Sequence, residues 1–94
     1  METYLNHIPG KNKGKLLLYA LSTCIWCKKT KALLESLGVD FYYIDVDLLE
    51  GDDKTKITND LFGWNSLKSF PTLVINNEKC IVGFNEEKIR MELE

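Results

Sequence analysis

Short apolar runs alternate with helical patterns along the chain. Residues 15–20 form a nearly continuous apolar run, which is typical of a buried strand. Residues 41–46 are rich in aromatic and β-branched side chains and predict a second strand. Thr72–Ile75 and Lys79–Val82 predict two further strands. An Asn-Asn pair between them favours a tight turn, because Asn tolerates left-handed backbone angles.

Three helical patterns lie between and after these strands. Residues 25–37 predict a helix that ends before a glycine suited to its C-terminal cap. A second helix is expected to be capped by Asp52 or Asp53 and to stop near Gly63, and a third to start after Asn85. Each pattern has a face of buried positions. These positions are Thr30, Leu33, Leu34 and Leu37 in the first helix, Ile57 and Leu61 in the second, and Ile89 and Leu93 in the third.

The order of elements is therefore β-α-β-α-β-β-α. The first two strands are joined by a helical crossover and should be parallel, whereas the last two form an antiparallel hairpin. This predicts an α/β domain with a four-stranded mixed sheet flanked by three helices, covering residues 15–94. Residues 1–14 carry several turn-forming residues and are expected to be a loosely ordered leader.

Composition and charge narrow the possible functions. Twelve basic and fourteen acidic residues among 94 give a net charge of -2, so no basic surface for nucleic acid is expected. No apolar run approaches the ~20 residues that span a bilayer, and we expect no membrane association. No secretion signal is visible, which favours the cytoplasm. Three cysteines are an odd number, which does not suit a secreted disulfide scaffold.

Two cysteines form a motif at the first strand–helix junction. Cys24 and Cys27 are the ends of Cys-Ile-Trp-Cys, a C-x-x-C at the start of the helix. Unpaired backbone N–H groups and the positive end of the helix dipole favour a thiolate at such a position. A separation of three residues places both sulfurs on one helix face, where a short disulfide can close. This placement is typical of redox-active thiols.

Two further motifs lie near predicted strands, and together with the C-x-x-C they resemble a known family. Phe70-Pro71-Thr72 precedes the third strand, and Gly83-Phe84 follows the fourth. Over residues 15–93 the chain is similar to glutaredoxins, which have the thioredoxin fold. The resemblance implies that Cys24 attacks a substrate disulfide and Cys27 then resolves the mixed disulfide. It also implies a cis-proline at Pro71 and a substrate- or thiol-binding groove. The groove residues would be Trp26, Phe70, Pro71, Thr72, Gly83 and Phe84.

The resemblance also bears on the electron donor and the partners. It implies no tightly bound cofactor, and a low-molecular-weight thiol such as glutathione or a reductase as donor. Leu21 stands where many glutathione-using members have lysine. Gly83-Phe84-Asn85 is similar to glutaredoxin-like proteins that thioredoxin reductase reduces. We expect disulfide-containing proteins as substrates and a monomeric chain.

The alternative is a metal- or iron–sulfur-binding module that uses the C-x-x-C. Zinc sites usually need four ligands, and the remaining candidates, Cys80 and His7, have no partner at a suitable spacing. Cys80 is interpreted as a core residue, because free cysteine behaves as a small buried hydrophobe. Lys28 and Lys29 are interpreted as part of a solvated helix face.

Overall fold

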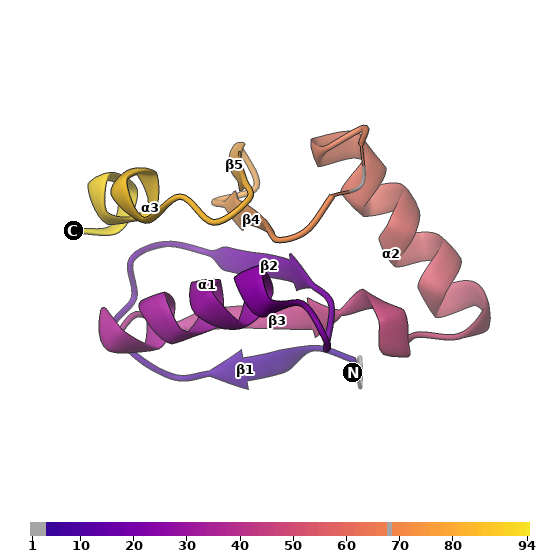
Figure 1. Cartoon of the computed structure of the whole chain (residues 1–94), viewed down its shortest axis with the longest axis horizontal. Coiled ribbons are helices and arrows are strands. Elements are labelled where there is room, and N and C mark those ends of the chain that lie inside the picture. Colours follow the sequence, from indigo (N-terminus) through magenta and orange to yellow (C-terminus); the bar gives the residue numbers. More distant parts are fainter. Residues whose placement is uncertain (1–3, 68) are drawn as a thin grey trace.

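The computed structural model describes residues 4–67 and 69–94 as five strands, three α-helices and one 3-10 helix. In chain order the elements are β1 (Asn6–Ile8), β2 (Leu16–Ala20), α1 (Ile25–Ser36), β3 (Phe41–Asp45), η1 (Val46–Leu48), α2 (Gly51–Trp64), β4 (Thr72–Ile75), β5 (Lys79–Val82) and α3 (Glu86–Leu93). Figure 1 shows their arrangement around one sheet. Among these helices, none combines the length and apolar character that crossing a bilayer requires.

The sheet has the strand order β1-β3-β2-β4-β5. β2 and β3 are parallel, as expected for strands joined by a helical crossover, and the other neighbours are antiparallel. Asn76 and Asn77 both have φ 55, so the predicted Asn-Asn turn between β4 and β5 is confirmed. The sheet thus has the predicted mixed arrangement of four strands, to which β1 is added at one edge.

The predicted number of four strands is wrong, because part of the expected leader pairs with β3. The ring of His7 stacks on Tyr42 at a centroid distance of 4.4 Å, and its Nε2 lies 2.8 Å from Asp40 Oδ1. β1 is only three residues long and mostly exposed, so it has no hydrophobic pattern that would indicate a strand. Contacts with residues more than thirty positions away hold it in place.

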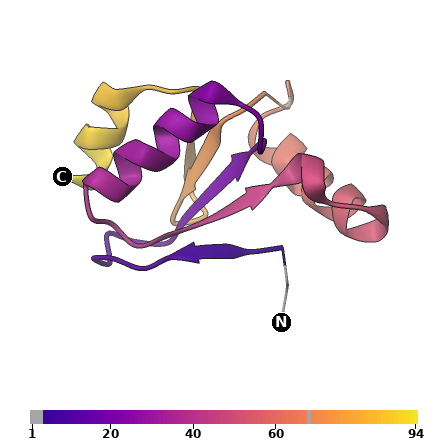
Figure 2. The same ribbon diagram turned by 60° about the horizontal axis from the view of Figure 1, so that its bottom comes forward.

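The helices cover both faces of the sheet. In Figures 1 and 2, α1 and α3 lie on one face and α2 lies on the other. Side chains of β2 alternate between two apolar clusters: Leu16 and Leu18 pack with α1 and α3, and Tyr19 packs with α2. A sheet covered on both faces is expected to have nearly continuous apolar strands, as β2 and β4 do.

The helix boundaries agree with the sequence at α1 and α3 and differ at α2. Helix α1 ends one residue earlier than predicted, and Gly38 follows with a left-handed φ of 70. The Asn85 side chain accepts a hydrogen bond from the Lys88 N–H at 3.0 Å, which confirms the predicted cap of α3. The predicted cap of α2 is wrong, whereas its predicted stop near Gly63 lies one residue before the observed end. Glu50 is its N-cap, and the helix continues through Gly63 to Trp64.

The difference in α2 has a local physical reason. Asp52 and Asp53 lie in the first helical turn, where a carboxylate interacts favourably with the positive end of the helix dipole without acting as the cap. Gly63 lowers helix propensity but does not prevent the helical backbone. The N–H of Asn65 donates to the Leu61 carbonyl at 2.8 Å and closes the final turn.

We predict that Leu34→Ala lowers the free energy of unfolding by about 2–5 kcal/mol, because it leaves a cavity in the core. Leu34 is fully buried between α1 and the sheet. Urea unfolding followed by circular dichroism measures the change. Met91→Ala on α3 is the control, since Met91 is 76% exposed and should change stability by less than about 0.5 kcal/mol. Equal effects of the two variants would contradict this packing.

Candidate active site

Cys24 is the N-cap of α1, at the end of the turn that follows β2. Its backbone is extended, and its N–H donates to the Leu21 carbonyl at 3.2 Å across the turn. Its sulfur accepts a hydrogen bond from the Cys27 N–H at 3.2 Å. This N–H is one of the donors at a helix start that have no partner within the helix. A donor directed at the sulfur, together with the helix dipole, stabilises negative charge on Cys24.

Cys27 has a different environment from Cys24. Its side chain is fully buried, whereas Cys24 is half-buried, and both thiols are free. The pKa of Cys27 is raised to about 12. Burial is the largest cause, and the side-chain hydrogen bond with Cys24 is the next. Burial has this direction because an apolar environment penalises the charged thiolate. Cys27 therefore holds a proton at neutral pH beside a sulfur that accepts a hydrogen bond from a backbone N–H.

A groove of about 250 Å³ lies at the start of α1. It is lined by Trp26, Phe70, Pro71, Gly83 and Phe84, which come from three separate parts of the chain. The Phe70–Pro71 peptide bond is cis, as the resemblance implied. The Gly83 N–H donates to the Pro71 carbonyl at 2.7 Å and ties the segment after β5 to the segment before β4. Cys24 packs against the same core cluster as Phe70 and Phe84.

Aromatic rings form one wall of this groove. Trp26 and Phe84 are stacked at a centroid distance of 6.0 Å, so the start of α1 contacts the segment between β5 and α3. Trp26 remains 52% exposed, and Lys29 Nζ lies 4.6 Å from its ring centroid. A cation over an indole face is attracted by the ring quadrupole. Lys28 and Lys29 are both exposed, as expected for a solvated helix face.

Thr72 is the one predicted groove residue that does not line the groove. It is fully buried, and its hydroxyl donates to the Ser69 carbonyl at 2.9 Å. Asn65, to which sequence reasoning assigned no role, lies beside it. Asn65 Nδ2 donates to Ser69 Oγ at 2.8 Å and to Thr72 Oγ1 at 3.2 Å, and Asn65 Oδ1 accepts from the Leu67 N–H. This buried amide positions the segment that leads to Pro71.

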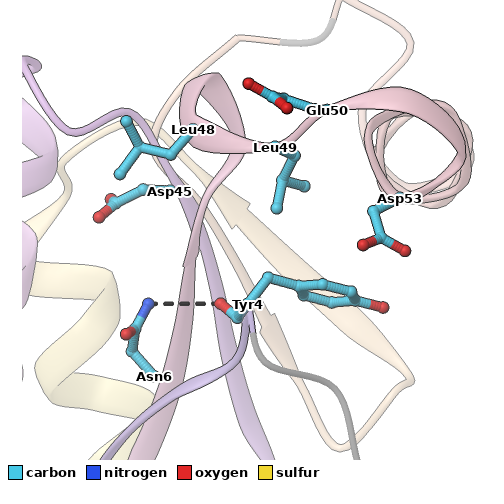
Figure 3. A pocket seen from close by; sticks show the side chains of 7 residues that line it. All are labelled: Tyr4, Asn6, Asp45, Leu48, Leu49, Glu50 and Asp53. Atoms are coloured by element: carbon cyan, nitrogen blue, oxygen red, sulfur yellow. Dashed lines mark hydrogen bonds between the residues drawn. The ribbon is translucent and has the colours of Figure 1, made fainter.

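Other clusters of polar groups lie apart from the groove. A hollow of about 400 Å³ lies at the end of β3. Figure 3 shows the Asp45 and Asp53 carboxylates on opposite sides of it. Asp45 is paired with Lys31 at 3.0 Å. Cys80 is half-buried on β5, and its thiol donates to the Trp64 carbonyl at 3.4 Å. In the described part of the chain, no three His, Cys, Asp or Glu side chains are grouped so that they could hold a metal.

We predict that iodoacetamide modifies Cys24 at least about tenfold faster than Cys27 at neutral pH, because only thiolates react and Cys27 is buried and protonated. Fragment mass spectra of the peptide that contains both cysteines measure the two rates on reduced protein. The same reaction in guanidinium chloride is the control, where both should react alike. Equal rates in the folded protein would contradict the described difference between the two thiols.

We predict that Asn65→Ala lowers the free energy of unfolding by about 1–3 kcal/mol, because it removes a buried amide with several hydrogen bonds. Denaturant unfolding measures the loss. Asn59→Ala is the matched control, because Asn59 is exposed on α2 and alanine favours a helix. If both variants were as stable as the parent protein, Asn65 would not organise this segment.

Comparisons with known proteins agree with this arrangement. The family model described as Glutaredoxin matches residues 16–81. A glutaredoxin-like 8.6 kDa protein in the rubredoxin operon of Clostridium pasteurianum is 35% identical over 72 residues, which cover 77% of this chain and 88% of that protein.

Two solved structures of proteins from the genus Methanosarcina are also similar. Methanosarcina acetivorans methanoredoxin is 52% identical with a TM-score of 0.87, over 89% of this chain and 88% of that one. The glutaredoxin from Methanosarcina mazei Go1 is 50% identical with a TM-score of 0.89, and the match covers 98% of this chain and 89% of that one. The thioredoxin-like fold implied by the sequence is thus confirmed, and the chain belongs to the glutaredoxin family.

Proposed function

We propose that this protein is a thiol–disulfide oxidoreductase that reduces protein disulfides or mixed disulfides by dithiol exchange. The observation that carries the proposal is the position of Cys24. Its sulfur accepts a hydrogen bond from the Cys27 N–H at the start of α1, and Cys24 packs against the same core cluster as Phe70 and Phe84, which line the neighbouring groove. Membership of the glutaredoxin family supports the same chemistry.

The two thiols have separate roles in this reaction. The Cys24 thiolate attacks one sulfur of the substrate disulfide, forms a new S–S bond with it and releases the other sulfur as a thiolate, which takes up a proton. Cys27 then loses its proton, and its sulfur attacks the Cys24 sulfur. This step forms the Cys24–Cys27 disulfide and releases the second substrate thiol. The substrate gains two electrons and two protons, and the protein is oxidised by the same amount.

The environment of Cys27 supports this order. A buried thiol that holds its proton does not compete as the first nucleophile. It lies one helical turn from Cys24, within reach of the mixed disulfide. Once the substrate sulfur is bound to Cys24, the Cys27 proton can leave with the departing group. The burial of Cys27 therefore separates the attacking step from the resolving step.

The groove supports a disulfide-containing protein as substrate. Among the residues that the structure describes, its lining consists of the aromatic residues Trp26, Phe70 and Phe84 together with Pro71 and Gly83, none of which is charged. Such a surface favours contact with apolar groups that flank a substrate cysteine.

We propose that a low-molecular-weight thiol or a reductase is the electron donor and that no cofactor is tightly bound. We also propose that the protein acts as a monomer in the cytoplasm.

We predict that Cys24→Ser abolishes disulfide reduction, because it removes the attacking thiolate. Cys27→Ser should retain exchange of a mixed disulfide with a small thiol and accumulate a covalent substrate adduct on Cys24, because the resolving thiol is absent. Reduction of insulin and of a glutathione mixed disulfide, followed by mass spectrometry of the adduct, measures these outcomes.

Cys80→Ser is the matched control, because Cys80 lies on β5 and does not line the groove. It should reduce disulfides at the parent rate. Full activity of Cys24→Ser would overturn the proposal. Anaerobically purified protein that carried iron or zinc and reduced no disulfide would support the alternative, a metal- or cluster-binding module.

A further inference from the structure

The turn that leads to Cys24 is held by a single carboxylate from another part of the chain. Asp47 lies in η1, after β3, and is 25 positions from Ser22. Asp47 Oδ1 accepts a hydrogen bond from the Ser22 N–H at 2.8 Å, and Asp47 Oδ2 accepts one from the Ser22 hydroxyl at 2.6 Å. Both oxygens of one carboxylate thus bind the backbone and the side chain of one residue.

Ser22 is inside the turn whose geometry places the sulfur. The turn closes with the hydrogen bond from the Cys24 N–H to the Leu21 carbonyl, and Ser22 lies directly after Leu21. The Ser22 N–H points out of this turn and has Asp47 as its partner. A turn residue with two bonds to a fixed acceptor loses freedom about its backbone dihedrals. This restriction of Ser22 also limits the orientation of Cys24 at the start of α1.

The same corner of the structure also holds the helix that follows Cys24. Asp45, two residues before Asp47, pairs with Lys31 of α1 at 3.0 Å, and both side chains are at least four-fifths buried. Lys31 Nζ also lies 4.0 Å from the Tyr43 ring centroid. Figure 3 shows Asp45 beside the 3-10 turn at this corner. The end of β3 and η1 therefore contact the chain on both sides of Cys24, through Asp45 after it and Asp47 before it.

Asp47 carries its charge while it holds Ser22. Two hydrogen bonds lower the pKa of Asp47 from its ordinary value: the one from the Ser22 hydroxyl has the larger effect, and the one from the Ser22 N–H the next. Charge-assisted hydrogen bonds of this kind are stronger than those between neutral groups. Asp47 is exposed and lies outside the groove, so it is not expected to touch a substrate.

We propose that Asp47 is a positioning residue for the nucleophile: through Ser22 it fixes the turn that aims Cys24 at its N–H donor and at the groove. This inference rests on the proposed function for its effect on turnover. Its effect on the reactivity of Cys24 itself can be measured without turnover. Reaction rates are sensitive to small displacements of a reacting group, since a productive approach requires a narrow range of distances and angles.

Two substitutions at one position separate geometry from charge. Asp47→Ala removes both acceptors. Asp47→Asn keeps an oxygen for the Ser22 N–H and offers an N–H to the Ser22 oxygen, so it preserves the positions of the atoms but loses the charge. Asp52→Asn is the control for charge alone, because Asp52 is exposed in the first turn of α2. Ser22→Ala removes only the hydroxyl bond and serves if Asp47→Ala does not fold.

Two quantities are measured on each variant, after circular dichroism has shown that it is folded. The first is the rate of Cys24 alkylation by iodoacetamide as a function of pH. The second is kcat/KM for reduction of insulin. A role confined to stability would change unfolding but leave both quantities of the folded protein unaltered.

The proposal expects Asp47→Ala to lower kcat/KM by on the order of tenfold, because the thiolate is displaced from its productive approach. It expects Asp47→Asn to stay within about twofold of the parent protein because asparagine can make both hydrogen bonds to Ser22. It expects the same of Asp52→Asn because charge effects at exposed positions are screened. The alkylation curve of Asp47→Ala should shift to higher pH than that of Asp47→Asn. Ser22→Ala should shift in the same direction by less, and should add nothing when combined with Asp47→Ala.

Identical alkylation curves for Asp47→Ala and Asp47→Asn would overturn the proposal, as would an Asp52→Asn variant that reproduced Asp47→Ala. The two proposals fail separately. If the parent protein reduced no disulfide while the alkylation curves still separated, the proposed function would be wrong and the positioning role would stand.

Discussion

The hydrogen bond from the Cys27 N–H to the Cys24 sulfur is the interaction on which the candidate site depends. It exists because α1 starts at Cys24, so the donors of the first helical turn have no partner within the helix. Elsewhere, Asn85 meets the same requirement at the start of α3 with a side-chain oxygen. At Cys24 the capping atom is a sulfur, and one contact both satisfies a helix donor and, in the proposed reaction, favours the attacking thiolate.

The two thiols have opposite requirements in the proposed reaction, and they differ in burial accordingly. In the proposed reaction Cys24 must reach a substrate, and it is half-buried, whereas Cys27 lies under the first turn with no exposed surface. Because burial penalises a thiolate, Cys27 holds its proton at neutral pH, and in the proposed reaction it loses this proton only at the resolving step. The packing of α1 on the sheet therefore contributes to the order of the proposed chemical steps as well as to stability.

The groove is a product of the sheet topology. β4 runs antiparallel to β2 with Thr72 opposite Tyr19, so the start of β4 lies beside the end of β2, from which the chain turns to Cys24. The hydrogen bond from Gly83 to Pro71 then brings in the end of β5. Behind this surface, buried Asn65 and exposed Asp47 hold the two segments that approach it, one before Pro71 and one before Cys24.

The amino-acid sequence by itself determined the features that depend on local physics. Apolar runs placed β2 to β5, Asn85 capped α3, and the C-x-x-C at a strand–helix junction identified Cys24 and Cys27, since each signal lies within a few residues. The resemblance to glutaredoxins, and not local physics, implied the groove residues, and all of these except Thr72 line the groove. Tertiary structure alone decided that the polar segment Asn6–Ile8 is a strand and that the Thr72 side chain is buried. It also decided that Asn65 holds the segment before Pro71 and that Asp47 holds the segment before Cys24. The reason is that these features depend on hydrogen bonds and ring contacts formed only when the chain is folded, and a polar residue gives no periodic signal of the partner it will meet.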